Sequence, residues 1–180
     1  MQRTIKYFFY TLITAVTLVS CGNSESLQRY YVDHQEAKGF VSQDFPLSMI
    51  EIDKTQFTAA QKEAYNSVDK LNFLGFKVSG DNQDAYQREL QKIKTILSDG
   101  KYNDLMEFND KGNKISVKYL GTNDEADEVV LFGSSDEMGF GIVRVLGNNM
   151  SPDKMVTLIE ALKGADIDEA QVEKVINFFK

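Results

Sequence analysis

The 180-residue sequence contains only one cysteine, one histidine and no tryptophan. The single cysteine, Cys21, cannot form a disulfide bond within the chain. Together with the single histidine, His34, it is too little for a metal site rich in cysteine or histidine. The sequence therefore predicts a domain that folds without a disulfide, a metal ion or another cofactor.

Basic residues are also in deficit, with 20 Lys and Arg against 27 Asp and Glu and a net charge of −7. Arg3 and Lys6 lie in the first 20 residues, which contain no acid, so the rest of the chain has 18 basic residues and a net charge of −9. Nucleic acids are bound by basic surfaces, and anionic lipids attract clusters of basic residues. We therefore expect no nucleic acid partner, and any membrane attachment should come from a lipid.

The amino terminus has the three parts of a secretory signal peptide. Residues 1–6 carry two positive charges, residues 7–19 form an uncharged, mostly apolar run of 13, and Ser20 is a small residue before Cys21. The apolar run is shorter than the roughly 17–25 residues of a membrane-spanning helix. Leu18, Ser20 and Cys21 resemble the lipobox, where the lipoprotein signal peptidase cuts just before a diacylated cysteine. We therefore expect cleavage after Ser20 and acylation of Cys21, for example with palmitate.

A short tether should follow the lipidated cysteine. Residues 22–26 are small and polar, and two or three acyl chains hold a protein durably at a membrane. The remaining length is typical of one domain, with no internal repeat or long linker. We therefore predict a signal peptide over residues 1–20, a lipidated tether over 21–26 and a single domain over 27–180, held close to the bilayer.

The first half of the expected domain combines helices and strands. One helix should follow Ser26, and another should begin at Thr58, with Gln61 in capping-box spacing. A third is indicated by four apolar residues at spacings of four, three and four, which share one face: Tyr86, Leu90, Ile93 and Leu97. These patterns predict helices over residues 27–38, 58–70 and 83–98 and strands over residues 40–45 and 71–78.

In the second half the pattern changes to the alternation of a half-buried strand, as in residues 115–119. Strands are expected over residues 102–108, 115–119, 129–132 and 140–146, and their short connections predict an antiparallel meander. Ser151-Pro152 should begin a helix. Asp166 should cap a final helix that buries Val172, Val175, Ile176 and Phe179. The predicted fold class is α+β, with helices packed on a mainly antiparallel sheet.

The second half also resembles a known family. The matching features are a Tyr-x-x-Leu-Met segment, a strand ending in Tyr, a Glu-then-aliphatic strand and a Phe-led strand ending near Gly. They correspond to Tyr102, Leu105, Met106, Tyr119, Glu128-Val129-Val130-Leu131, Phe140 and Gly147. The chain is similar here to small lipoproteins of the Bacteroidota catalogued as domain of unknown function 4252. That resemblance implies a lipoprotein of the cell envelope and supplies no activity.

The resemblance also bears on where the domain faces. In Bacteroidota, export of lipoproteins to the cell surface is helped by an acidic stretch just after the cysteine. Residues 22–26 contain one acid, Glu25. We therefore expect an anchor in the outer membrane with the domain on the periplasmic side.

His34 is the first candidate for chemistry. As a general base it would need a nucleophile and an orienting acid within hydrogen-bond reach, but Asp33 and Glu36 point elsewhere on a helix. No Gly-x-Ser-x-Gly nucleophile motif occurs. We predict a partly exposed helix residue, whose replacement by alanine changes stability by less than about 0.5 kcal/mol.

Three further groups of residues have ordinary explanations. Gly139-Phe140-Gly141 lacks the third glycine of a dinucleotide fingerprint and is expected to lie in a strand or bulge. The densest acidic group could bind calcium but lacks the order of an EF-hand loop, so a solvated turn is expected at Asp124, Glu125, Asp127 and Glu128. Another acidic group is better explained by helix capping: Asp166, Asp168 and Glu169.

Three functions remain open from the sequence. The first is a non-enzymatic binding module for an envelope protein or polymer. The second is an enzyme acting on an envelope polymer through two carboxylates, which would lie about 5–9.5 Å apart across a cleft. The third is a regulatory lipoprotein that acts through a protein partner. The absence of a recognisable catalytic constellation favours the first.

Overall fold

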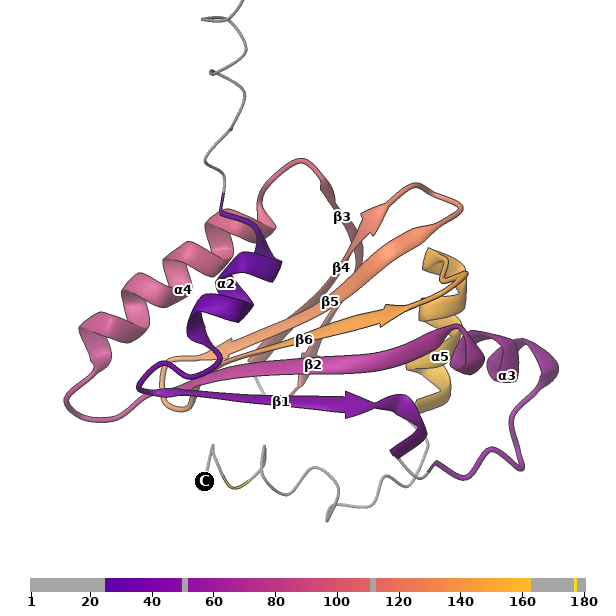
Figure 1. Ribbon diagram of the computed structural model, residues 1–180, viewed down its shortest axis with the longest axis horizontal. Helices are drawn as coiled ribbons and strands as arrows, with labels where there is room; N and C mark the ends of the chain where they lie inside the picture. The colour runs from indigo at the N-terminus through magenta and orange to yellow at the C-terminus, as the bar shows by residue number, and fades with distance from the viewer. Residues whose placement is uncertain (1–24, 50–51, 111–112, 163–176, 178–180) are drawn as a thin grey trace, which may run out of the picture.

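Six strands form one antiparallel sheet in the computed structural model, which describes residues 25–49, 52–110, 113–162 and 177. The strands are β1 (Phe40–Pro46), β2 (Val68–Lys77), β3 (Tyr102–Asp110), β4 (Asn113–Gly121), β5 (Ala126–Ser135) and β6 (Gly139–Gly147). The helices are α2 (Leu27–His34), α3 (Ala59–Asn66), α4 (Gln83–Leu97) and α5 (Pro152–Leu162), with a 3-10 turn, η1 (Leu47–Met49), after β1. The α+β prediction is confirmed (Figure 1).

The strand order is β1-β2-β6-β5-β4-β3, and every neighbouring pair is antiparallel. Strands β3 to β6 follow one another as the predicted meander, and β2 pairs with β6 to add the β1–β2 hairpin. The last two strands of the meander are therefore internal, as their apolar sequences predict. Within the described residues, no helix is long and apolar enough to cross a membrane.

Two helices are shorter than the sequence predicts. The first ends at His34, because the Ala37 amide donates a hydrogen bond to the His34 carbonyl group. Gly39, with φ +87°, then leads the chain into β1. The second begins with the predicted capping box but ends at Asn66. Val68 is buried as expected, but it begins β2 and lies opposite Gly147 of β6. Pairing with β6 outweighs the local helical pattern here.

Helices α2 and α4 cover one face of the sheet, named here the α2/α4 face. All four predicted apolar residues of α4 are buried. They pack with Tyr30 of α2 and with side chains from the central strands: Leu74, Phe76, Val130, Phe132, Phe140 and Ile142. These strand residues come from the end of β2, the end of β5 and the start of β6, so the two helices cover one end of this face.

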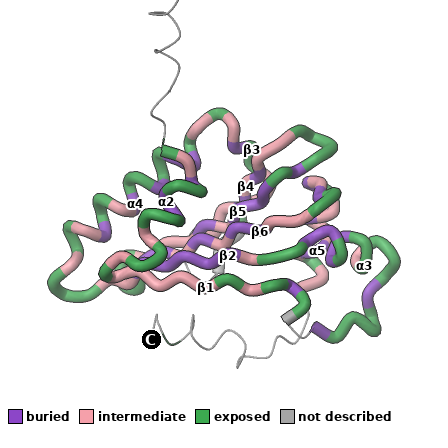
Figure 2. Tube along the Cα trace, in the orientation of Figure 1, coloured by how far each residue is buried: buried purple, intermediate pink, exposed green. Residues whose placement is uncertain are grey.

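The opposite face, named the α3/α5 face, carries the second apolar cluster. Tyr65 of α3 and Met155 and Leu158 of α5 pack on it. Their partners lie at the other end of the strands: Val68, Tyr119, Ala126, Val129 and Val145. The two helix pairs therefore cover opposite faces at opposite ends of the sheet (Figure 1), and burial is concentrated in the central strands between them (Figure 2).

Candidate functional site

A row of three glycines crosses the centre of the sheet. Gly75 of β2 lies opposite Gly141 of β6, and Gly141 lies opposite Gly133 of β5. Because side chains alternate along a strand, these glycines share the α3/α5 face with the next row, Phe73, Val143 and Leu131. Three neighbouring strands thus present backbone without side chains, beyond the end that α3 and α5 cover.

A shallow groove of about 390 Å³ lies over this part of the sheet. Its described lining is Phe73, Ile115, Leu131, Phe132, Gly133, Ser134, Ser135, Met138, Gly139, Phe140, Gly141 and Val143. None of these residues is ionisable, and only the two serines carry a polar side chain. Met138 at its rim is 44% exposed, one of the two exposed large apolar side chains in the described part of the chain. The groove is therefore suited to an apolar occupant, and the described lining contains no acid or base for catalysis.

The predicted strand or bulge at Gly139-Phe140-Gly141 is confirmed, since all three residues lie in β6. Gly139 has φ +119°, and a Cβ atom there would come within 1.8 Å of the Phe76 carbonyl oxygen. Only glycine permits β6 to begin this close to β2. The motif therefore shapes the end of the groove and has no strand-to-helix geometry for a dinucleotide.

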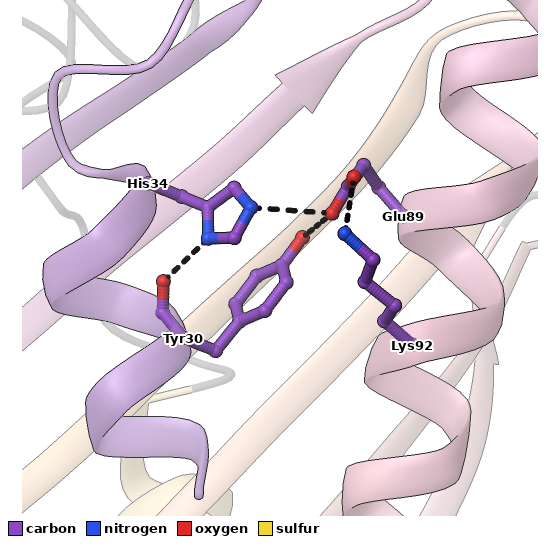
Figure 3. Close-up of polar contacts among 4 residues, drawn as sticks. All are labelled: Tyr30, His34, Glu89 and Lys92. Carbon is purple, nitrogen blue, oxygen red and sulfur yellow. Dashed lines mark hydrogen bonds and ion pairs between the residues drawn. The ribbon is translucent and has the colours of Figure 1, made fainter. Parts of the chain in front are cut away.

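A polar cluster joins α2 to α4 (Figure 3). The Tyr30 hydroxyl donates to Glu89 Oε2 at 2.8 Å, and Lys92 Nζ donates to Glu89 Oε1 at 2.8 Å. His34 Nε2 lies 3.4 Å from Glu89 Oε2, and its Nδ1 lies 2.8 Å from the Tyr30 carbonyl oxygen. The His34 ring stacks on Tyr30 at 4.0 Å and packs against Phe40 at 4.8 Å. His34 therefore packs on Tyr30 of α2 and contacts Glu89 of α4, so it helps to hold the two helices together.

The pKa values in this cluster follow from the contacts. Burial raises the pKa of the Tyr30 phenol, and its hydrogen bond to Glu89 raises it further. Burial acts to raise the pKa of Glu89, but hydrogen bonds from Lys92 and Tyr30 outweigh it and hold the pKa below its usual range. Tyr30 therefore remains a donor and Glu89 an acceptor. The His34 side chain is 16% exposed, as a partly exposed residue should be, but its partner Glu89 is 55 residues away and no local pattern indicates it.

A second polar cluster is buried on the α2/α4 face. Arg144 of β6 donates to Glu128 of β5 through Nε to Oε1 and Nη2 to Oε2, both at 2.8 Å. The prediction that Glu128 belongs to a solvated turn is therefore wrong, because its side chain is only 9% exposed. Burial alone would lower the pKa of Arg144, but the hydrogen bonds to Glu128 and its negative charge outweigh burial and raise the pKa. Burial, together with the charge of Glu128, raises the pKa of nearby Tyr102 to about 12.

The remaining predicted site residues separate into two groups. Ser20 and Cys21 lie outside the described residues, as do the acids assigned to capping a final helix: Asp166, Asp168 and Glu169. Asp124 and Glu125 are exposed at the β4–β5 turn, where Thr122 Oγ1 accepts from their amides, and Asp127 is exposed at the second position of β5. In the described ranges, no three His, Cys, Asp or Glu side chains gather as a metal site.

Comparison with known proteins identifies one family. The family model described as "Domain of unknown function (DUF4252)" matches residues 30–158. This range spans all six strands and so includes the glycine row, the groove and both polar clusters. No curated protein and no solved structure matches the chain.

Proposed function

The chain belongs to the DUF4252 family, and we propose that it is an envelope lipoprotein, anchored through a lipid on Cys21, whose domain binds an apolar partner. The anchor is supported by the charged start, the short apolar run and the cysteine after Ser20. An outer-membrane location on the periplasmic side, as expected from the family resemblance and the single acid in the tether, is part of this proposal.

The start of the folded domain supports a position close to the membrane. Ser26 caps α2 by accepting from the Arg29 amide at 3.1 Å, and this cap lies five residues after Cys21 in the sequence. Five residues span at most about 17 Å when fully extended. A domain held this closely can meet partners in the same membrane or in the adjacent envelope.

The groove on the α3/α5 face carries the binding proposal. It is apolar, it lies at the end of the sheet that α3 and α5 leave uncovered, and its described lining has no ionisable side chain. An apolar segment of an envelope protein suits this surface better than a charged polymer does. The regulatory alternative, which also acts through a protein partner, is compatible with the same surface.

The carboxylate-enzyme alternative gains less support from the described residues. The two sheltered carboxylates already accept hydrogen bonds, Glu128 from Arg144 and Glu89 from Tyr30 and Lys92, and the exposed Asp44 accepts from Tyr31 and Asn72. Each serves to hold elements of the fold together. None lines the apolar groove.

Cell fractionation and mass spectrometry test the anchor. The wild-type chain should partition with membranes, and its amino-terminal peptide should begin at Cys21 with the added mass of acyl chains. The variant Cys21→Ser should lose both properties, whereas Ser24→Ala, in the same tether, should keep them. Equal partitioning of wild type and Cys21→Ser would refute the lipoprotein proposal.

Photo-crosslinking in intact cells tests the groove. A photoreactive residue at Met138, on the groove rim, should capture a discrete envelope protein. The same residue at Val32, which is 56% exposed but lies on α2, serves as the matched control. Leu131→Lys should abolish capture from Met138 in a chain that remains folded. Equal capture from both positions, or none from Met138, would count against the groove as a binding site.

A further inference from the structure

The outer side of α4 forms a second surface, on the opposite face of the sheet from the apolar groove. We propose that this side of α4 lies against the membrane that holds the lipid anchor and contacts the phosphate and ammonium groups of zwitterionic phospholipids. This inference rests on the proposed anchor at Cys21 and adds the orientation of the domain to it. The groove on the α3/α5 face is not involved.

Basic side chains gather on α4 although the chain as a whole is acidic. Glu89 is the one acid between Ala85 and Leu97, and its side chain is only 15% exposed and accepts hydrogen bonds from Tyr30 and Lys92. The exposed residues of this stretch are all basic or uncharged: Gln87, Arg88, Gln91, Lys92, Lys94 and Thr95. The helix therefore presents cations and hydrogen-bond donors to solvent, although residues 21–180 have a net charge of −9.

A hollow of about 780 Å³ lies along this side of α4. Four residues at spacings of three, one and three line it from one side of the helix: Arg88, Gln91, Lys92 and Thr95. The one apolar side chain in its described lining, Ile96, is buried. The hollow therefore suits a polar, hydrated partner better than the apolar core of a protein interface.

Two acids complete the charge pattern of the hollow. Glu25 and Asp99 also line it. Asp99 follows the end of α4, and Glu25 precedes Ser26, the cap of α2, whose start lies beside the end of α4 (Figure 1). Two cations and two acids in one hollow complement the phosphate and the ammonium group of a zwitterionic headgroup. A uniformly anionic surface would instead be repelled by the net charge of the chain.

The distance from the anchor supports the same partner. Glu25 lies four residues after Cys21 in the sequence, and four residues span at most about 14 Å. Acyl chains on Cys21 would enter the hydrocarbon layer, so Glu25 is held within that distance of the headgroup region. The helices α3 and α5 pack on the other face, at the opposite end of the strands. The tether therefore brings the hollow beside α4 to the headgroups.

Arg88 is the cation best placed to bind phosphate. Lys92 Nζ lies 2.8 Å from Glu89 Oε1, which offsets its charge. Arg88 makes no ion pair within the part of the chain that the structure describes. Its planar guanidinium group can donate two parallel hydrogen bonds to a phosphate. The charge of Arg88 should therefore matter most for the orientation.

Lysine acetylation on vesicles tests the orientation. The mature chain, residues 21–180, is coupled through its single thiol, Cys21, to a maleimide lipid in vesicles of equal parts phosphatidylethanolamine and phosphatidylcholine. The same chain capped with N-ethylmaleimide is the soluble reference. Mass spectrometry should show that Lys92 is acetylated at least about threefold more slowly on the vesicles, because the headgroups shield it. Lys62, exposed on α3, should react equally fast in both states.

Two comparisons separate headgroup contacts from shielding by the tether alone. In phosphate-free vesicles of digalactosyldiacylglycerol, the slowing at Lys92 should fall by at least about half, because the acceptor for Arg88 is missing. Arg88→Glu should have the same effect on the phospholipid vesicles. Lys62→Glu makes the same change of charge on α3 and should leave the slowing at Lys92 as in the wild type.

Each outcome supports or overturns the orientation. Slowing that is confined to Lys92 and depends on phosphate and on Arg88 supports it. Equal slowing at Lys62, no slowing at Lys92, or equal slowing on both kinds of vesicle overturns it.

This inference and the proposed anchor can fail separately, because the vesicles supply the anchor chemically. If Cys21→Ser fractionates like the wild type in cells, the lipoprotein proposal fails whatever the vesicles show. If cells do acylate Cys21 but Lys92 is not shielded on the vesicles, the anchor stands and the orientation is wrong.

Discussion

Arg144 and Glu128 form a doubly hydrogen-bonded ion pair inside the α2/α4 face, with each residue less than a tenth exposed. Glu128 lies two residues before Val130, the partner of Arg144 across β5 and β6, so the pair is diagonal on one face. Removing charges from water is costly, and the two hydrogen bonds offset that cost only while both partners remain. The pair therefore acts as a constraint on the register of the two strands.

Breaking this pair should be strongly destabilising. Glu128→Leu or Arg144→Met alone should lower the free energy of unfolding by about 3–5 kcal/mol, because each leaves a buried group without its partner. The double variant Glu128→Leu with Arg144→Met should recover most of that loss. Urea denaturation of the mature chain measures all three. Arg29→Ala is the control, since its pair with Asp33 is exposed and 3.7 Å long, and it should change stability by less than about 0.5 kcal/mol. Additive losses in the double variant would contradict a coupled pair.

The cluster around Glu89 should make stability depend on pH in the acid range. Its pKa in the folded chain is held below the ordinary value of 4.5, because Lys92 and Tyr30 stabilise the carboxylate. Such a group contributes stability that is fully present above its unfolded pKa and is lost as the pH falls through its folded pKa. The stability difference between wild type and Glu89→Gln should therefore shrink between about pH 6 and pH 3. Chemical denaturation at each pH measures it, and a constant difference would show that Glu89 does not carry the effect.

His34 should matter more for stability than its sequence suggests. Its ring nitrogen bonds the Tyr30 carbonyl group, and the ring packs between Tyr30 and Phe40. His34→Ala should cost about 1–2 kcal/mol, above the 0.5 kcal/mol limit expected for a surface residue. Val32→Ala, on the exposed side of the same helix, is the control and should cost less than about 0.5 kcal/mol. If the two variants melt alike, the packed position of His34 is wrong.

The elements that periodicity marks were predictable from the sequence. The apolar face of α4 and the meander from β3 to β6 follow local patterns of period 3.6 and 2, and both are confirmed. The end of α3 was not predictable, because the start of β2 at Val68 is set by pairing with a strand about 80 residues away. Local sequence does not contain that information.

The candidate site depends even more on strand register. Gly75, Gly133 and Gly141 are each visible as glycines within apolar runs, which is a signal of close backbone approach. Their alignment in one row appears only when β2, β6 and β5 are paired. Glu128 was misassigned because it ends an acidic run, although Arg144, alone in an apolar strand, indicated that a buried partner was needed.

Two glycines at the groove should respond in opposite ways to the same substitution. Gly139 has φ +119°, and a Cβ atom there would lie 1.8 Å from the Phe76 carbonyl oxygen, whereas a Cβ atom at Gly133 would meet only Ile115 Cγ1 at 3.5 Å. Gly139→Ala must therefore distort the turn between β5 and β6 or its pairing with β2, at a cost of about 3 kcal/mol or more. Gly133→Ala should be neutral or raise stability by up to about 1 kcal/mol, since alanine restricts the unfolded chain. Urea denaturation of both variants beside the wild type measures the contrast. If Gly139→Ala proved as stable as Gly133→Ala, β6 would not begin against Phe76, and the end wall assigned to the groove would be wrong.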